Sequence, residues 1–372
     1  MKNTLIILFF FINTYIFAND GAYYTSGNQL IPMYESDISV RKEILSIKKI
    51  DGDKVLVNVY YEFYNPKGNK NILVGFEAGY PEGDTDARPK NGHHPNISRF
   101  TVKMNDQLLP YKIAYTTDSI YYKNGTIQSL SLEQMQSNDI SDFIDGAFGY
   151  VYHFNAPFKK GMNIIQHSYI FDMSGSVDWR YDFDYILTAA NRWANQQIDD
   201  FTLIIDMGEF QDFYITDDFV KGNINWTVNG LAQMTSSNEI SFPYQVENRK
   251  FSHFYWQTGN LYFHKDNFRP INELTILSLN FLMTNKFFSH ENDILPYSYE
   301  QEYYISAQDE LSLKILRNLP YARRGYIFKS EEIQKYYESM GWYKEDPNYQ
   351  AEPEYLSEME RKWLGQLKPN TD

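Results

Sequence analysis

Short segments in which apolar and polar residues alternate make up much of the chain between residues 20 and 293. Segment 54–64 is the clearest, because its apolar residues recur at every second position: Val55, Val57, Val59, Tyr61 and Phe63. A period of two is typical of a strand that buries one face, and the turn residues Asn-Pro-Lys-Gly at 65–68 end this one. Further strands are predicted at 99–104, which forms a hairpin with 107–113, and at 150–154, 163–171, 201–207, 224–228 and 274–281.

Many short strands at roughly ten-residue spacing predict a mainly β fold with an antiparallel β-sandwich body. Two places interrupt the alternation. Residues 82–96 form a polar loop, and residues 129–145 have helical spacing at Leu130, Leu132, Met135 and Ile140. We therefore expect two sandwiches, at 19–125 and 148–293, joined by a helical connector at 126–147.

After Pro296 the apolar spacing becomes that of helices. Ser306 begins an S-x-x-D helix start, and Ser330 begins a second helix with acidic residues in its first turn. Gly341 ends this second helix, which has one apolar face: Ile333, Tyr336, Tyr337 and Met340. The pattern predicts a small helical domain at 299–345 and a polar C-terminal tail at 346–372, with a short helix at 354–364.

The N-terminus has the pattern of a secretory signal peptide. Lys2 is the only charge before Asp20, residues 4–17 are almost wholly apolar, and Ala18 offers a small residue for cleavage. A membrane-spanning helix needs about 20 apolar residues, and this run is shorter. We expect residues 1–18 to be removed on export to a periplasmic or extracellular location, and no membrane span elsewhere.

The composition limits which partners the chain can bind and which covalent links can stabilise it. The chain has no cysteine, so we expect no disulfides and no lipid anchor at the end of the signal peptide. Its net charge is −14, and an acidic surface disfavours nucleic acid as a partner. The 32 Tyr and 26 Phe residues favour half-buried strands.

Three blocks near the C-terminus match a known family in order and spacing: Leu316-Arg317-Asn318, Tyr321-Ala322-Arg323-Arg324-Gly325-Tyr326-Ile327-Phe328, and Tyr336-Tyr337 with Trp342-Tyr343. They resemble the YARHG domain, which is named for a Tyr-Ala-Arg-His-Gly motif and occurs in exported bacterial proteins. Arg324 stands where the motif has His, and Pro320 is expected to end or kink the first helix. Because arginine stays protonated, this copy of the motif lacks an acid or base at that position.

The long alternating strands at 38–64 and a second segment at 169–203 carry a further similarity. The second segment contains Phe183-Asp184-Tyr185-Ile186-Leu187, Trp193 and the stretch 198–201. Both segments resemble a family of exported bacterial proteins known as domain of unknown function 4424. Neither family implies a known reaction.

Two groups of side chains suggest metal binding. His93 and His94 are adjacent in the polar loop, but neighbouring residues of an extended chain point in different directions, which favours a solvated loop. A set of close carboxylates has the spacing of calcium ligands: Asp178, Asp182 and Asp184. The set lacks the glycine turn and terminal glutamate of a calcium loop, and Arg180 lies within it, so surface charge pairing is the preferred interpretation.

Three arginines lie within an aromatic segment of an otherwise acidic chain, which predicts a cationic-aromatic pocket for a carboxylate such as a wall-peptide terminus. The residues of this predicted binding site are Arg317, Arg323, Arg324, Tyr321, Tyr326, Trp342 and Tyr343. The preferred interpretation is nevertheless structural: the arginines join the two helices through acidic residues while the aromatics form the domain core. The candidate partners are Asp309, Glu310, Glu331 and Glu332.

The sequence contains no nucleophile elbow, phosphate loop, HExxH or dinucleotide fingerprint. We therefore predict no catalytic residues, no metal ligands and no cofactor. The preferred interpretation is a noncatalytic binding or structural module of the cell envelope, with peptidoglycan or another envelope protein as its partner. The alternative is an envelope hydrolase with its site in the β-rich body.

Overall fold

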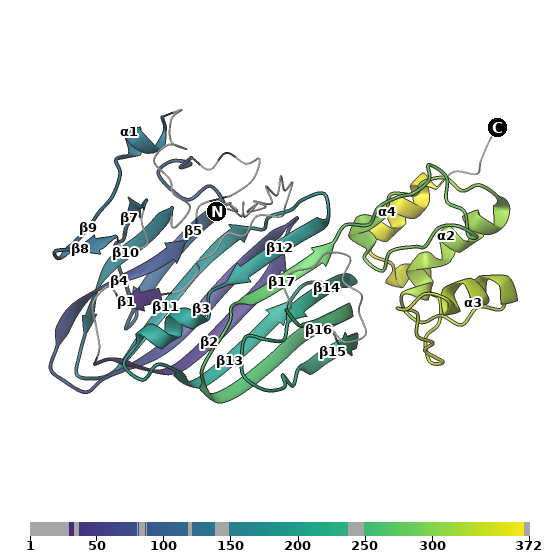
Figure 1. The fold of residues 1–372 in the computed structure, drawn as a ribbon. Coiled ribbons are helices and arrows are strands. Elements are labelled where there is room, and N and C mark those ends of the chain that lie inside the picture. The colour runs from purple at the N-terminus through teal and green to yellow at the C-terminus, as the bar shows by residue number, and fades with distance from the viewer. Residues whose placement is uncertain are drawn as a thin grey trace, which may run out of the picture.

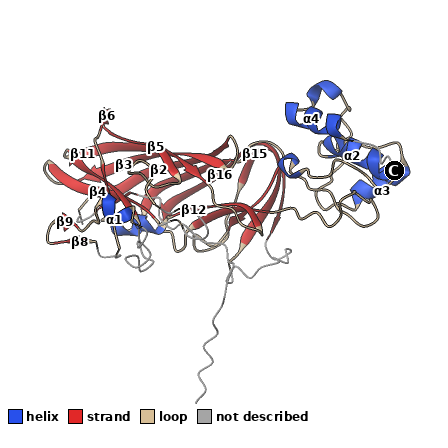
Figure 2. Ribbon diagram, turned by 90° about the horizontal axis from the view of Figure 1, so that it is seen from above, coloured by secondary structure: helices blue, strands red, loops and turns tan. Residues whose placement is uncertain are grey.

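The computed structural model describes residues 30–32, 37–79, 81, 86, 88–117, 121–137, 149–236 and 249–367, so the predicted signal peptide lies outside it. Strands form the body, and the longer helices are gathered at one end of the molecule (Figures 1 and 2). This arrangement confirms a mainly β fold with a small C-terminal helical domain. No helix in the described ranges is both long enough and apolar enough to cross a membrane.

The body is built on one large sheet of 11 strands in the described part of the chain. Along this sheet the strands follow the order β12-β17-β14-β16-β13-β2-β3-β11-β5-β6, with β15 paired to β16. The strands are β2 (Ser39–Ile50), β3 (Lys54–Asn65), β5 (Ile97–Met104), β6 (Gln107–Leu108), β11 (Gly161–Asp172), β12 (Trp179–Tyr185), β13 (Ile198–Asp206), β14 (Gln211–Thr216), β15 (Thr227–Ser236), β16 (Phe251–Phe268) and β17 (Leu274–Leu279).

A smaller sheet packs against one part of the large sheet. Its order is β1-β4-β10-β7, with bounds β1 (Leu30–Pro32), β4 (Lys70–Ala78), β7 (Lys112–Tyr115) and β10 (Tyr150–Phe158). The ring of Phe76 on β4 lies 5.1 Å from the rings of Phe100 on β5 and Tyr169 on β11, measured between centroids. These two sheets form a sandwich, and β8 (Tyr122–Lys123) pairs with β9 (Thr126–Ile127) beside it.

The far end of the large sheet curls back over the same core. Phe183 on β12 contacts Phe171 on β11 with ring centroids 5.6 Å apart, although six strands separate β12 from β11 in the sheet order. The hydroxyl groups of Tyr185 on β12 and Tyr61 on β3 are 3.3 Å apart. The sheet therefore encloses one continuous apolar core.

Strands from both predicted sandwich segments share this sheet, because β2 pairs with β13 in parallel. The sheet is thus not purely antiparallel, and it continues across the boundary expected near 126–147. The proposed domain limits stay a prediction. Within the expected connector, α1 (Leu132–Met135) is the only helix among the described residues and has four residues, while 138–148 lie outside them.

Local predictions in the body are largely confirmed. The five apolar residues predicted to face the core of the 54–64 strand are all buried. The hairpin after 99–104 turns at Asn105 and Asp106, whose φ angles of 49° and 67° fit a type I′ turn. The strand predicted at 224–228 begins later, at Thr227 of β15.

Three helices form the C-terminal domain: α2 (Glu310–Ala322), α3 (Glu331–Glu338) and α4 (Glu358–Gln366). The predicted start of α2 at Ser306 is wrong by one turn, because the Asp309 side chain accepts the hydrogen bond from the Ser312 amide at 2.8 Å. Pro320 does not end α2, which continues to Ala322. The missing amide removes the backbone bond to the Leu316 carbonyl, yet the two residues after Pro320 stay helical.

Residues 346–367 belong to this domain rather than trailing from it. Trp363 of α4 is buried in the domain core and donates a hydrogen bond from Nε1 to the Tyr304 carbonyl at 3.1 Å. The α4 helix has a capping box formed by Ser357 and Glu360. The helical domain in turn contacts the body, since the Gln233 side chain donates to the Trp342 carbonyl at 3.0 Å.

Candidate ligand-binding face on the large sheet

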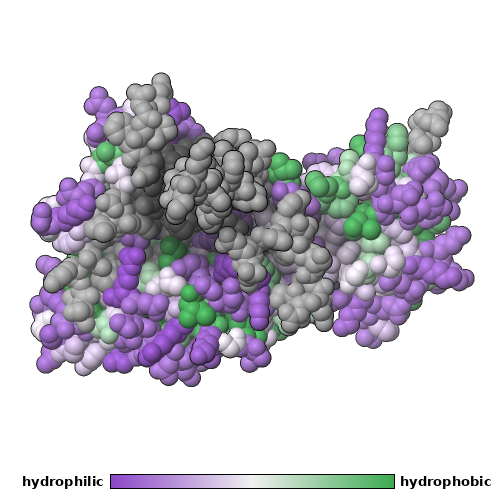
Figure 3. Space-filling model, in the orientation of Figure 1, coloured by the Kyte–Doolittle hydropathy of each residue, from purple (hydrophilic) through white to green (hydrophobic). Residues whose placement is uncertain are grey.

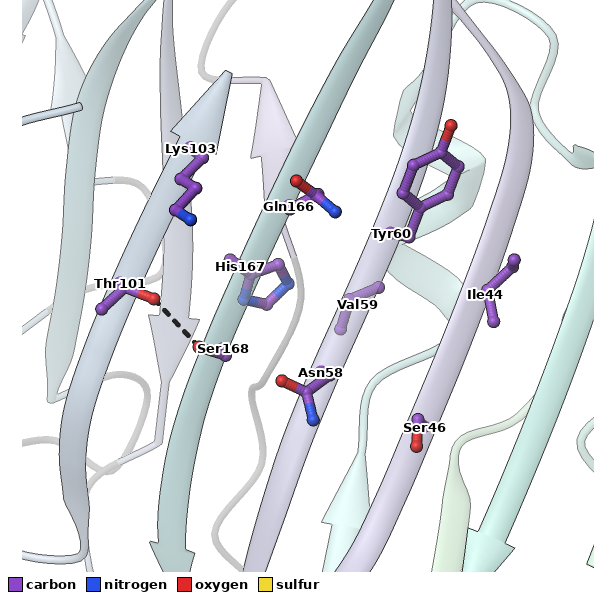
Figure 4. Close-up of a pocket in the computed structure, with 10 residues that line it drawn as sticks. All are labelled: Ile44, Ser46, Asn58, Val59, Tyr60, Thr101, Lys103, Gln166, His167 and Ser168. Atoms are coloured by element: carbon purple, nitrogen blue, oxygen red, sulfur yellow. Dashed lines mark hydrogen bonds between the residues drawn. The ribbon is translucent and has the colours of Figure 1, made fainter. Parts of the chain in front are cut away.

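Two rows of side chains run across the outer side of β5, β11, β3 and β2 (Figure 4). The pairing register places the members of each row directly opposite one another. On each of these strands the residue between the two rows is buried in the core, so the side chains of the rows point outward. These buried residues are Leu45, Val59, Val102 and His167. We name this surface the two-row face; row one is Lys103, Gln166, Tyr60 and Ile44, and row two is Thr101, Ser168, Asn58 and Ser46.

The two-row face encloses a shallow open hollow of about 280 Å³. Row two consists of short side chains, three with a hydroxyl and one with an amide, and each can both donate and accept hydrogen bonds. Thr101 Oγ1 and Ser168 Oγ are 2.9 Å apart, and Asn58 and Gln166 are exposed. The face can therefore form many neutral hydrogen bonds with a polar ligand.

Tyr60 adds an aromatic ring to the hollow and is fixed in place. Its hydroxyl donates to Glu62 Oε1 at 2.9 Å. Partial burial and this carboxylate raise the pKa of Tyr60, so the hydroxyl stays protonated at neutral pH. Figure 4 shows the ring in row one, on the strand next to Gln166, with its hydroxyl pointing away from row two.

Charges at the border of the face are largely paired. Lys42 Nζ is 2.8 Å from Asp200 Oδ2, and this hydrogen bond raises the pKa of Lys42 and lowers that of Asp200. Among the described residues, one group of possible metal ligands converges here, with its ligand atoms within 4.8 Å of one another: Asp200, His264 and Asp266. Because Asp200 already pairs with Lys42, we assign no metal to this group.

The predicted arginine pocket has carboxylate partners within the chain. Arg323 is buried and pairs with Glu302, and burial raises the pKa of Glu302 to about 7 although Arg323 opposes that shift. Arg324 makes a bidentate pair with Glu360 of α4, with both N–O distances 2.8 Å. These partners differ from the four acidic residues expected. Arg317 is exposed on α2.

The aromatic residues of the predicted pocket do gather in one place. Trp342 is buried in the domain core and donates from Nε1 to the Leu295 carbonyl at 3.3 Å. Tyr343 donates to the Tyr326 carbonyl at 2.7 Å, and Tyr321 packs against the same core. Ligand binding by this set stays a prediction, but its buried members also hold the domain together.

The expected surface pairing of the close aspartates is wrong. Asp182 is buried on β12, and Asp184 accepts a hydrogen bond from the Thr275 hydroxyl. Burial raises the pKa of Asp182 to about 8 and that of Asp184 to about 6. Arg180 instead pairs with Glu300, which comes from the segment leading to the helical domain.

His94 is likewise not part of a solvated loop. It is buried, its Nε2 lies 2.8 Å from the Gly79 carbonyl oxygen, and its Nδ1 accepts from the Asn96 amide at 3.1 Å. Burial lowers the pKa of His94 to about 4. With both ring nitrogens engaged, this histidine is a structural residue.

Sequence reasoning missed the two-row face. The alternation in 54–64 placed Asn58 and Tyr60 opposite the core, and the same period gives Gln166 and Ser168 in 163–171. Alternation does not show that β3 and β11 are neighbours in perfect register, and only that register lines these side chains up.

Comparisons with known proteins agree with the fold. A crystal structure of a Legionella pneumophila protein provisionally named a nutrient-binding protein covers 92% of this chain and 97% of its own, with a TM-score of 0.50 and 15% identity. At that identity the likeness shows a shared fold and nothing more. An M1 zinc metallopeptidase from Deinococcus radiodurans covers 68% of this chain and 43% of its own at 8% identity, with a TM-score of 0.25 that supports no argument.

A structure of baculovirus P35 has a TM-score of 0.27 at 12% identity, covers 65% of this chain and 97% of its own, and also supports no argument. No curated protein sequence matches the chain. The similarity of the body to domain of unknown function 4424 stays a prediction. The C-terminal resemblance is supported: residues 291–369 match the family model of the YARHG domain.

Proposed function

We propose that this chain is an exported, noncatalytic binding protein of the cell envelope that holds peptidoglycan on its two-row face. The observation that carries the proposal is the hollow itself, where four adjacent strands present eight outward side chains in register. The provisional name of the Legionella pneumophila protein that shares the fold is consistent with binding rather than catalysis.

The arginine set is a weaker candidate for the primary site. Arg323 and Arg324 are engaged with Glu302 and Glu360, and a ligand carboxylate would have to displace those partners from buried positions. Breaking a buried ion pair costs roughly 3–5 kcal/mol. The two-row face needs no such rearrangement, because its side chains already face outward.

Co-sedimentation with purified cell-wall sacculi tests the proposal. The protein without residues 1–18 should sediment with sacculi. The double variant Asn58→Ala, Gln166→Ala should bind about thirtyfold more weakly, since two hydrogen bonds contribute roughly 1 kcal/mol each. Met162→Ala is the matched control, because Met162 is 51% exposed on the same side of β11 but lies outside the hollow. It should bind like the unaltered protein.

Three other outcomes would overturn this assignment. Failure of the unaltered protein to sediment removes peptidoglycan as the partner, and capture of a single envelope protein instead would identify a protein partner. Weaker binding of Arg317→Ala with normal binding of the double variant would return the site to the helical domain. Release of soluble wall fragments would favour the hydrolase.

A further inference from the structure

We infer that the ligand of the two-row face is an extended, uncharged glycan chain that runs across the strands, an assignment that rests on the function proposed above. It specifies the polysaccharide of the wall rather than its peptides. The inference comes from the spacing of the rows, the chemistry of their side chains and the shape of the hollow.

The spacing of row two suits a linear chain of repeating units. Thr101, Ser168, Asn58 and Ser46 come from four adjacent strands, and neighbouring strands lie about 4.7–4.9 Å apart. A ligand crossing the strands therefore meets one short polar side chain per step, at an interval close to the length of one hexose in an extended chain. A peptide would run along a strand edge instead, where backbone groups are free.

The chemistry of the hollow suits sugar hydroxyl groups. Amides and hydroxyls donate and accept, as sugar hydroxyls do, and the Tyr60 ring offers a flat surface against which the apolar face of a sugar can stack. Lys103 is the one charged side chain that lines the hollow. The other nine lining residues carry no charge, because buried His167 is neutral, so most of the surface suits an uncharged ligand.

The shape of the hollow favours a ligand that lies on the surface. Enclosed small-molecule sites occupy about 300–1,000 Å³ and bury most of their ligand, whereas this hollow of about 280 Å³ is open. Row two continues onto β13 with Ile204, which is paired to Ser46 and has no polar group. The polar stretch thus spans four strands, which corresponds to about four sugar units.

Titration with uncharged chito-oligosaccharides of two, four and six units tests the length and site of binding. Affinity should rise at least tenfold from two to four units and then change less than twofold to six. Tyr60→Leu should weaken binding of the four-unit chain at least tenfold, whereas Tyr60→Phe should retain most of it because the ring remains. Met162→Ala should bind normally, and thermal melting should show that each variant is folded.

A second experiment separates this inference from the function on which it rests. Amidase frees glycan strands of their peptides but leaves a carboxylate on each muramic acid, so these carboxylates are first converted to methyl amides. The resulting uncharged strands should compete with sacculi for the protein, and the released peptides should not. If sacculi bind but the strands and oligosaccharides do not, the glycan assignment is overturned while the envelope function stands. If sacculi do not bind either, both fail, and equal binding by Tyr60→Leu would remove the two-row face as the site.

Discussion

His167 is a buried histidine at the centre of an aromatic cluster. Its ring is stacked between those of Tyr61 and Tyr169, with centroids 6.0 Å and 5.9 Å away. Neither ring nitrogen has a hydrogen-bond partner in the part of the chain that the structure describes. Burial lowers the pKa of His167 to about 3, so the imidazole is neutral in the folded protein.

Replacing His167 with leucine should stabilise the protein. At neutral pH the substitution removes two buried polar atoms without partners and should raise the free energy of unfolding by about 1–2 kcal/mol. In the unaltered protein, His167 of the unfolded chain is protonated below about pH 6.5, whereas in the folded protein it is protonated only below about pH 3. The free energy of unfolding therefore falls as the pH falls through that window. Urea unfolding at pH 7 and pH 4 measures both effects.

The stability advantage of His167→Leu should therefore grow by about 3 kcal/mol between pH 7 and pH 4. An advantage that does not change with pH would show that the imidazole is hydrated or hydrogen-bonded in solution. The period of the strand predicts that positions 167 and 169 face inward, but Tyr61 and Phe76 contact His167 from strands β3 and β4 and have no local signal.

At the scale of elements, the backbone just after α2 explains why the Tyr-Ala-Arg-Arg-Gly stretch ends in a glycine. Gly325 has φ +82°, and an added Cβ would lie 2.5 Å from the Lys344 carbonyl oxygen. The chain also closes on itself here, because the Asp346 amide donates to the Gly325 carbonyl at 2.8 Å. The motif glycine is thus required both by backbone conformation and by close packing.

Gly325→Ala should destabilise the helical domain much more than a glycine substitution made for conformation alone. Gly208 is the matched control, since it has φ +84° but no atom within 4 Å of an added Cβ. Gly208→Ala should cost about 1 kcal/mol from backbone strain, and Gly325→Ala about 2–4 kcal/mol because a backbone clash is added. Chemical unfolding of the two variants measures the difference, and equal costs would contradict the packing argument.

Local signals predicted most elements but not all of their limits. The apolar face of α3 and the alternation of β3 were visible because each depends on neighbours within one element. The start of α2 was misplaced because Ser306 and Asp309 both suit a helix cap, and the side-chain bond to Ser312 decides between them. Arg324 could not be matched to Glu360 because 36 residues separate them.

At the scale of the whole molecule, the helical domain is attached to the body by aromatic and charged contacts. The Arg324 guanidinium lies 4.5 Å from the centre of the Phe210 ring, and Tyr255 of β16 packs against Tyr297 with centroids 5.5 Å apart. In Figure 3 apolar side chains are visible on the helical domain and also on the lower part of the body. Phe210, which precedes β14 of the body, therefore packs against the helical domain.

Phe210→Ala should uncouple the two parts. Phe210 is buried and joins the domain core, so its truncation should cost about 3–5 kcal/mol and separate a single calorimetric transition into two. Phe287→Ala is the control, because Phe287 is 38% exposed in the segment that leads to the domain. A single, equally cooperative transition in Phe210→Ala would show that the junction does not depend on this ring.

The order in which the strands of the body pair could not be predicted from the sequence, for a physical reason. Alternating strands specify which face is buried, but two strands with similar patterns can pair with many partners. The predicted separation of 19–125 from 148–293 followed from the polar and helical interruptions between them. The structure joins β2 and β13 side by side, and no turn or linker in the sequence indicates that pairing.

The pairing of β2 with β13 limits the order in which the chain can fold. Lys42 and Asp200, which meet between β2 and β13, are 158 positions apart, so β2 gains its second neighbour only after more than half of the polypeptide has been made. Closing so long a loop is slow, and contacts of this kind lower folding rates. Until the segment around Asp200 has been made, β2 lacks one of its two neighbours and the central sheet stays incomplete.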